Sequence, residues 1–237
     1  MALPLINDAP KYELIIPSTK EKIKFRPFLV KEQKNLLIAY ESKDANQIMH
    51  AMLDCVGSCC EGVDAYKLST FDVDYMFTQV RAKSVGETTE LAGICSECQR
   101  ETPIVVDISK IELKEGSVKD NIIEITDKIS IKMKYPTYTD FMNTLIINEE
   151  LTPTQAMLGT VVSCIESVMT EEENISIKDE PKEEIEKFID SLTSTQFEKI
   201  MEFIDGIPKL VHEQKFNCSS CGQENILKLE GLQDFFS

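Results

Sequence analysis

The chain has 237 residues, of which 42% are hydrophobic and 28% charged, and its formal net charge is -16. This composition is ordinary for a globular protein, and the length allows one large domain or two small ones. So acidic a chain repels a phosphate backbone, which argues against nucleic-acid binding, and no apolar run is long enough to span a bilayer. The N-terminus lacks the features of a signal peptide, so the eight cysteines are expected in a reducing compartment, where metal ligands are favoured over disulfides.

The N-terminal part predicts an extended arm over residues 1–10, followed by a β-hairpin. Two apolar-rich segments, 12–17 and 22–28, flank four turn residues, and the second alternates polar and apolar side chains. One face of this second strand carries Lys22, Lys24 and Arg26. These cations are interpreted either as a solvated edge that resists aggregation or as a contact surface, for an acidic partner or for the chain's own acidic residues 171–173.

Helical periodicity replaces the strand pattern after this hairpin. It predicts three helices, over residues 31–42, 45–60 and 69–86. The next segment, 87–134, is expected to be mostly strand, and it ends in a second hairpin formed by 122–125 and 129–133.

Four cysteines lie within predicted helices, namely Cys55, Cys59, Cys60 and Cys164. Cys55 and Cys59 are four residues apart, so they lie on one helix face. The four thiols could form a metal cluster, but a reduced cysteine more often packs as a small buried hydrophobe. We therefore expect them to belong to the core.

The stretch 135–207 is expected to be a helical insert. Thr152, Pro153 and Gln155 are the residue types that favour an N-cap, an N1 position and a capping box. This helix is expected to continue through Ile165 and Val168. Residues 170–186 are acidic and mostly polar, and Glu171, Glu172 and Glu173 are expected to form a solvated loop, with a partner-binding acidic patch as the alternative.

Two matched thiol pairs are the most informative motif of the chain. The pairs are Cys95-Ser-Glu-Cys98 and Cys218-Ser-Ser-Cys221, and a strand-like run follows each of them. Zn²⁺ in structural sites takes four tetrahedral ligands, and each CxxC turn can direct two thiolates to one point. The repeat therefore predicts a single zinc site held by all four cysteines.

Three alternatives to this zinc site remain. A redox CxxC motif normally opens a helix, whereas strands are expected after both pairs here. Structural disulfides require an oxidising compartment. Two separate zinc sites would lack ligands, since the only histidines are His50 and His212.

The predicted fold class is α+β, with helical bundle segments, a β-hairpin and a split zinc-ribbon-like β unit. Four segments are expected in one compact unit: hairpin and helices (1–86), first zinc knuckle and strands (87–134), helical insert (135–207), and second knuckle with C-terminal tail (208–237). A metal held by both knuckles would join the ends of the insert. Phe235 and Phe236 in the tail are expected either to fold onto the ribbon or to bind a partner.

Catalytic motifs are absent from the sequence. Its nine glycines are scattered, and neither G-x-S-x-G nor H-E-x-x-H occurs. A catalytic zinc needs an open coordination position, which four cysteines do not leave. We therefore expect a protein that is not an enzyme and has no small-molecule substrate.

Residues 17–34, PSTKEKIKFRPFLVKEQK, resemble the opening of the T4-like bacteriophage base plate protein family. The resemblance implies a structural or assembly protein of the central hub of the tail baseplate, acting through protein–protein contacts with other hub or tail proteins. The implied location is the host cytoplasm during assembly, or the baseplate of the virion tail. The alternative function is a zinc-ribbon regulator that binds polymerase or nucleic acid, which a basic patch near the knuckles would have favoured.

Overall fold

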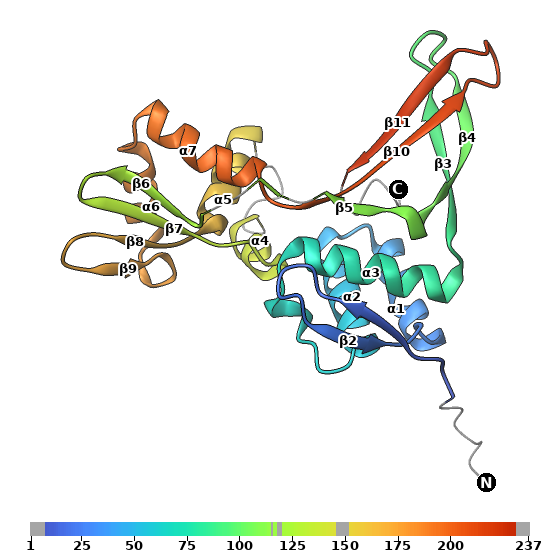
Figure 1. Cartoon of the computed structure of the whole chain (residues 1–237), viewed down its shortest axis with the longest axis horizontal. Helices are drawn as coiled ribbons and strands as arrows, with labels where there is room; N and C mark the ends of the chain where they lie inside the picture. Colours follow the sequence, from blue (N-terminus) through green and yellow to red (C-terminus); the bar gives the residue numbers. More distant parts are fainter. Residues whose placement is uncertain (1–7, 115, 118–119, 146–151, 231–237) are drawn as a thin grey trace. The chain divides into compact units, whose positions relative to one another are not determined.

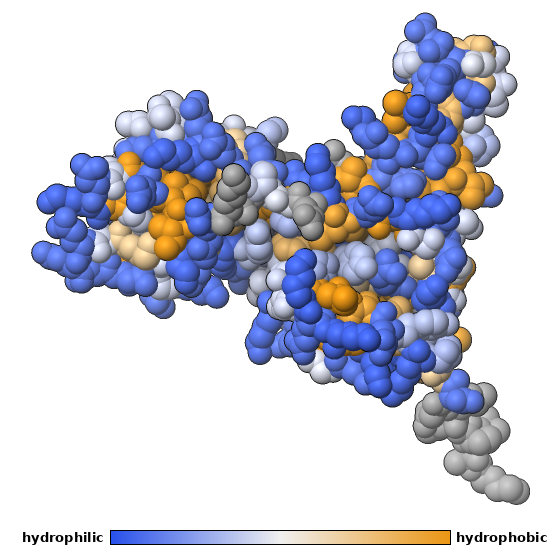
Figure 2. All heavy atoms as spheres, viewed as in Figure 1, coloured by the Kyte–Doolittle hydropathy of each residue, from blue (hydrophilic) through white to orange (hydrophobic). Residues whose placement is uncertain are grey.

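The computed structural model describes residues 8–114, 116–117, 120–145 and 152–230, and the chain divides into two compact units. Unit 1 combines residues 1–114 with 209–237, and unit 2 contains residues 115–208. Both contain helices and small antiparallel sheets, which confirms the α+β class (Figure 1). On the face drawn in Figure 2, hydrophilic residues cover most of the surface and hydrophobic residues are visible in smaller patches.

The N-terminal part of unit 1 is a hairpin packed with three helices. Its elements are β1 (Tyr12–Ile15), β2 (Lys22–Phe25), α1 (Val30–Ser42), α2 (Ala45–Cys59) and α3 (Thr70–Val85). The predicted hairpin and three helices are thus confirmed, with ends that differ by a few residues. Ile23 and Phe25 are buried, as the alternation of polar and apolar side chains in this strand predicts.

Polar side chains of the N-terminal motif join the hairpin to the helices. Ser18 donates hydrogen bonds from its amide (2.8 Å) and its hydroxyl (2.5 Å) to the fully buried carboxylate of Asp72 in α3. Arg26 contacts the carboxylate of Glu32 in α1 at 2.9 Å, and only 5% of the Glu32 side chain is exposed. Since buried polar groups need partners, these contacts hold the hairpin in one position.

The second part of unit 1 consists of strands from both ends of the chain. Its strands are β3 (Thr88–Ile94), β4 (Glu101–Asp107), β5 (Glu112–Lys114), β10 (Lys209–Asn217) and β11 (Glu224–Glu230). β3 pairs with β4, and the other three form a sheet in the order β11-β10-β5. Pairing of Lys114 with Lys209 joins the two ends of the segment that forms unit 2.

Unit 2 has a four-stranded antiparallel sheet in the order β6-β7-β8-β9, together with four helices among its described residues. The elements are β6 (Ile122–Thr126), β7 (Ile129–Met133), α4 (Tyr138–Leu145), α5 (Pro153–Cys164), β8 (Ile165–Met169), β9 (Asn174–Ser176), α6 (Lys182–Asp190) and α7 (Ser194–Asp205). Fully buried Ile131, Met133 and Ile200 contribute to its core. The second predicted hairpin, β6–β7, and the capping box at Thr152 are confirmed.

One expectation for the stretch 135–207 was wrong. The helix that begins at Pro153 ends at Cys164, and Ile165 starts strand β8, because Val168 and its neighbours pair with β7. The solvated loop expected at Glu171–Glu173 is confirmed, since these residues are exposed and lie between β8 and β9. The rest of the acidic segment 170–186 includes β9 and the beginning of α6. Ile185 and Ile189 are buried at helical spacing, so an apolar stripe orders this acidic segment.

Candidate metal centre

The two CxxC pairs form the turns of the hairpins β3–β4 and β10–β11 (Figure 1). Both turns close in the same way. In the first, the amide of Cys95 donates to Arg100 O (3.0 Å) and the amide of Gln99 donates to Cys95 O (3.0 Å). In the second, Cys218 donates to Gln223 O (2.9 Å) and Gly222 donates to Cys218 O (2.9 Å). The repeat noted in the sequence is therefore a repeat of backbone structure.

Each turn needs one residue with a positive φ, directly after its second cysteine. The two residues are Gln99 (φ 56°) and Gly222 (φ 76°). Glycine adopts this left-handed conformation without steric cost, whereas a side chain there is uncommon. The first turn accepts this cost at Gln99, whose side-chain amide donates to Ser96 O at 3.0 Å.

The four cysteine sulfurs converge between the two turns. The Sγ atoms of Cys95 and Cys221 are 3.6 Å apart, those of Cys98 and Cys218 are 3.5 Å apart, and all four lie within 4.8 Å of one another. A tetrahedral site with Zn–S bonds of about 2.3 Å places its sulfurs about 3.8 Å apart. The size and the donor chemistry of this cluster therefore fit a metal ion with four thiolate ligands.

Backbone amides favour the ionised form of two of these thiols. Amides of Cys221 and Ser220 lower the pKa of Cys218 to about 6, and amides of Cys98 and Glu97 lower the pKa of Cys95. The pKa of Cys221 is raised to about 12: the amide of Gln223 lowers it, but the neighbouring sulfurs together outweigh that effect. Thiolates this close repel one another, and a divalent cation would remove the repulsion.

Reciprocal polar contacts lock the two turns together. Ser96 donates from its amide (3.0 Å) and hydroxyl (2.9 Å) to Oδ1 of Asn225 in β11, and the amide of Ser219 donates to Oγ1 of Thr102 in β4 at 3.2 Å. Asn225 also donates to the sulfur of Cys95 at 3.6 Å. Thr102 and Asn225 are both buried, and each lies four residues after the second cysteine of its pair. Neither residue was predicted as part of the site, although their matching positions in the repeat were a usable signal.

The two hairpins also pack closely below the turns. A Cβ atom on Gly93 would lie 2.3 Å from Cδ1 of Ile104 and 2.8 Å from the ring of Phe216. A side chain at this position in β3 would therefore require the side chains of Ile104 and Phe216 to move. This close approach of β3 to β10 helps to bring the two CxxC turns together.

The remaining cysteines lie in cores, as expected. Cys55, Cys59 and Cys60 are buried in unit 1, and Cys164 belongs to the core of unit 2. Over the residues that the structure describes, the only group of three or more potential metal ligands is the one at the two turns.

The cationic face of β2 is partly used within unit 1. Lys22 contacts Glu13 at 2.6 Å, Arg26 pairs with Glu32, and the exposed Lys24 has no ion pair within the described ranges. Phe235 and Phe236, the other residues expected to bind a partner, lie outside the described residues.

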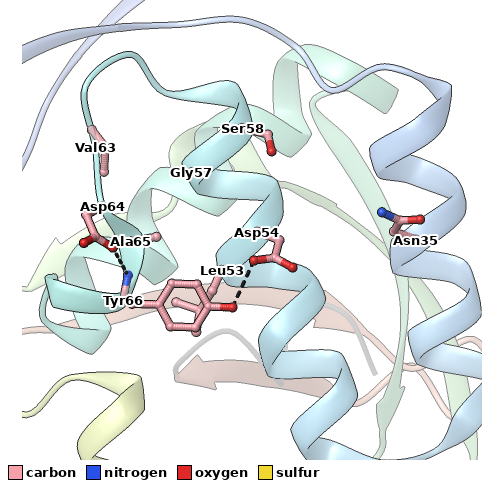
Figure 3. A pocket seen from close by; sticks show the side chains of 9 residues that line it. All are labelled: Asn35, Leu53, Asp54, Gly57, Ser58, Val63, Asp64, Ala65 and Tyr66. Atoms are coloured by element: carbon pink, nitrogen blue, oxygen red, sulfur yellow. Dashed lines mark hydrogen bonds between the residues drawn. The ribbon is translucent and has the colours of Figure 1, made fainter.

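A shallow hollow of about 360 Å³ lies in unit 1 between α1, α2 and the segment that follows α2 (Figure 3). Tyr66 donates from its hydroxyl to Asp54 (2.9 Å) and from its amide to Asp64 (3.3 Å), and Lys67 pairs with Asp64 at 3.0 Å. Burial and the carboxylate of Asp54 raise the pKa of Tyr66 to about 12, so its hydroxyl stays protonated at neutral pH.

Within the described residues, no helix is both long and apolar enough to cross a membrane.

Comparison with known proteins extends the resemblance seen in residues 17–34. A family profile described as "T4 bacteriophage base plate protein" matches residues 9–237. The chain is also 21% identical over 227 residues to the baseplate hub assembly protein gp26 of Enterobacteria phage T4. The aligned region covers 95% of this chain and 98% of that protein. No solved structure matches the chain.

Proposed function

Because the chain belongs to the T4 bacteriophage base plate protein family and has a structural or assembly role in the phage baseplate, we propose that it assembles the central hub of that baseplate. The observation that carries this proposal is the extent of the match to the hub assembly protein, 95% of one chain and 98% of the other. The family resemblance predicted from the N-terminal motif is thereby confirmed.

We further propose that one Zn²⁺ ion is bound by Cys95, Cys98, Cys218 and Cys221, in a split zinc-ribbon-like unit. The convergence of the sulfurs within 4.8 Å supports this assignment. Zinc with four thiolates has no open position for substrate or water, so its role would be structural. It would hold together two hairpins that are separated in the sequence by the whole of unit 2.

The protein is proposed to act by protein–protein contacts with other hub or tail proteins, without catalysis. A chain with net charge -16 repels nucleic acid, which favours a protein partner. The same charge argues against the alternative function, a regulator that binds polymerase or nucleic acid. Lys22 and Lys24 remain proposed contacts, and Arg26 would support them from inside the domain through Glu32. Assembly would take place in the host cytoplasm, and retention in the virion tail is the alternative.

The test is infection with a phage whose gene for this chain carries an early stop codon. Complete hubs should be missing from the lysate, and the wild-type chain supplied from a plasmid should restore them. Normal hubs without the chain would refute the proposal. Mass spectrometry of purified wild-type tails would then separate a resident hub subunit, present in finished particles, from an assembly factor found only in assembling lysate.

A further inference from the structure

Helix α1 has an exposed apolar face on the side opposite its packing against unit 1. Glu32 and Ala39 are its buried residues, and Val30, Leu37 and Ile38 lie on the other side of the helix, with 79%, 55% and 52% of their surfaces exposed. Single exposed apolar residues are normal, but several at helical spacing on one face form a patch.

Two opposite charges lie on this same face. Lys34 and Glu41 are seven residues apart, so they project in nearly the same direction, and both are exposed. Neither forms an ion pair or a side-chain hydrogen bond within the described part of the chain, whereas Lys31 on the flank of the helix contacts Glu32 at 3.4 Å. Each charge is therefore available to an external group.

The arrangement of this face is self-complementary. The midpoint between Lys34 and Glu41 lies between Leu37 and Ile38. If two copies of α1 pack antiparallel about a two-fold axis through this midpoint, Lys34 of each copy faces Glu41 of the other. Leu37 and Ile38 then pack against their counterparts at the centre, which is the arrangement of an isologous interface.

We propose that this face of α1 is a homodimer interface, in which a second copy of the chain covers Leu37 and Ile38 and two reciprocal Lys34–Glu41 ion pairs set the register. This goes beyond the proposed role in hub assembly and does not depend on it. One helix face buries less than the roughly 800 Å² per partner of a standard stable interface. The dimer is therefore weak and forms in a concentration-dependent manner.

The test is analytical ultracentrifugation of the full, metal-loaded chain from low micromolar to several hundred micromolar concentration. The wild type should show a monomer–dimer equilibrium, and Leu37→Asp should be monomeric throughout. Lys34→Glu and Glu41→Lys should each weaken dimerisation about tenfold or more, because like charges then face each other. The first change makes the chain more acidic and the second less so, which means that a general charge effect would move the two variants in opposite directions.

The double variant Lys34→Glu/Glu41→Lys should recover the wild-type dimerisation constant. Lys24→Glu, an exposed lysine on β2, is the matched control and should dimerise like the wild type. An unchanged melting temperature in every variant excludes unfolding as the cause. A wild type that stays monomeric, a dimer that Leu37→Asp does not affect, or a double variant as weak as the single ones would overturn the proposal.

Discussion

Unit 2 and the paired CxxC hairpins of unit 1 are held together by different kinds of contact. Unit 2 encloses a core of its own, in which Ile131, Met133 and Ile200 are completely buried. The hairpins have a smaller apolar cluster near their bases, including Leu210 and Leu229, and at their tips they rely on four sulfurs and polar contacts. A two-stranded hairpin is marginal in water by itself, so a metal can take the place of an apolar core.

This difference implies that the two regions should fail independently. Damage at the sulfur cluster should loosen the hairpins and leave unit 2 folded, whereas damage to the core of unit 2 should leave metal binding intact. Because each region has its own cluster of contacts, the two regions should not unfold in a single cooperative transition.

The largest effect is expected from removing a sulfur ligand. Cys95→Ser and Cys218→Ser should each destabilise the hairpins by several kcal/mol, because each opens the same tetrahedron. Hydrogen exchange should accelerate in β3 and β10 and stay slow in β7. If only one of the two variants loses protection, the two turns do not share a metal.

A core truncation in unit 2 should have the next largest effect. Ile200→Ala removes a fully buried side chain of α7 and should cost about 2–5 kcal/mol, measured by denaturant unfolding of unit 2. Ile122→Ala, at a position 48% exposed, is the control and should change stability little. Loss of metal from the Ile200→Ala variant would contradict independent regions.

A smaller effect is expected at the polar contacts between the turns. Asn225→Ala removes the acceptor for Ser96 and should cost roughly 1 kcal/mol, since it breaks two partly buried hydrogen bonds whose donors can still reach water. Metal affinity should fall, as it does when groups that orient metal ligands are removed. Thr102→Val should act similarly through Ser219, and Glu224→Ala, an exposed neighbour, should act on neither quantity.

The smallest effect depends on pH and concerns the N-terminal motif. Burial raises the pKa of Glu32, but hydrogen bonds from Arg26 and from the amide of Leu29 outweigh burial and lower that pKa below its ordinary value. The ionised carboxylate therefore stabilises unit 1 above the ordinary carboxyl pKa, and this stabilisation is lost as pH falls through the lowered value. Acid unfolding of unit 1 should depend less on pH in Glu32→Gln, and an unchanged dependence would argue against this contact.

Local chemistry explains which features could be predicted from the sequence. The hairpin at β2, the capping box at Thr152 and the closure of each CxxC turn all depend on residues close together in the chain. Strand β8 could not be predicted, because a short apolar run after a helix fits a continued helix as well as a strand. Its pairing with β7, which is distant in the sequence, determines that it is a strand. The contact of Asn225 with Ser96 likewise depends on how two distant hairpins meet.

The pairing of β5 with β10 was missed for the same reason. Lys114 pairs with Lys209, which is far away in the sequence, and nothing in the two segments indicates that they pair. The two CxxC pairs predicted that the metal would join the ends of the insert. In the structure this strand pair joins them directly, and the cysteines lie at the other end of β10.

The metal content of the purified chain tests the central structural claim most directly. Elemental analysis should give one zinc per chain, and cobalt substitution should give the absorption spectrum of a tetrahedral tetrathiolate site. Cys98→Ser and Cys221→Ser, one from each turn, should both lose the metal. A single site built from Cys95, Cys98, Cys218 and Cys221 would be contradicted by a chain that contains no metal or two equivalents. It would also be contradicted if a variant altered in either turn retained one equivalent.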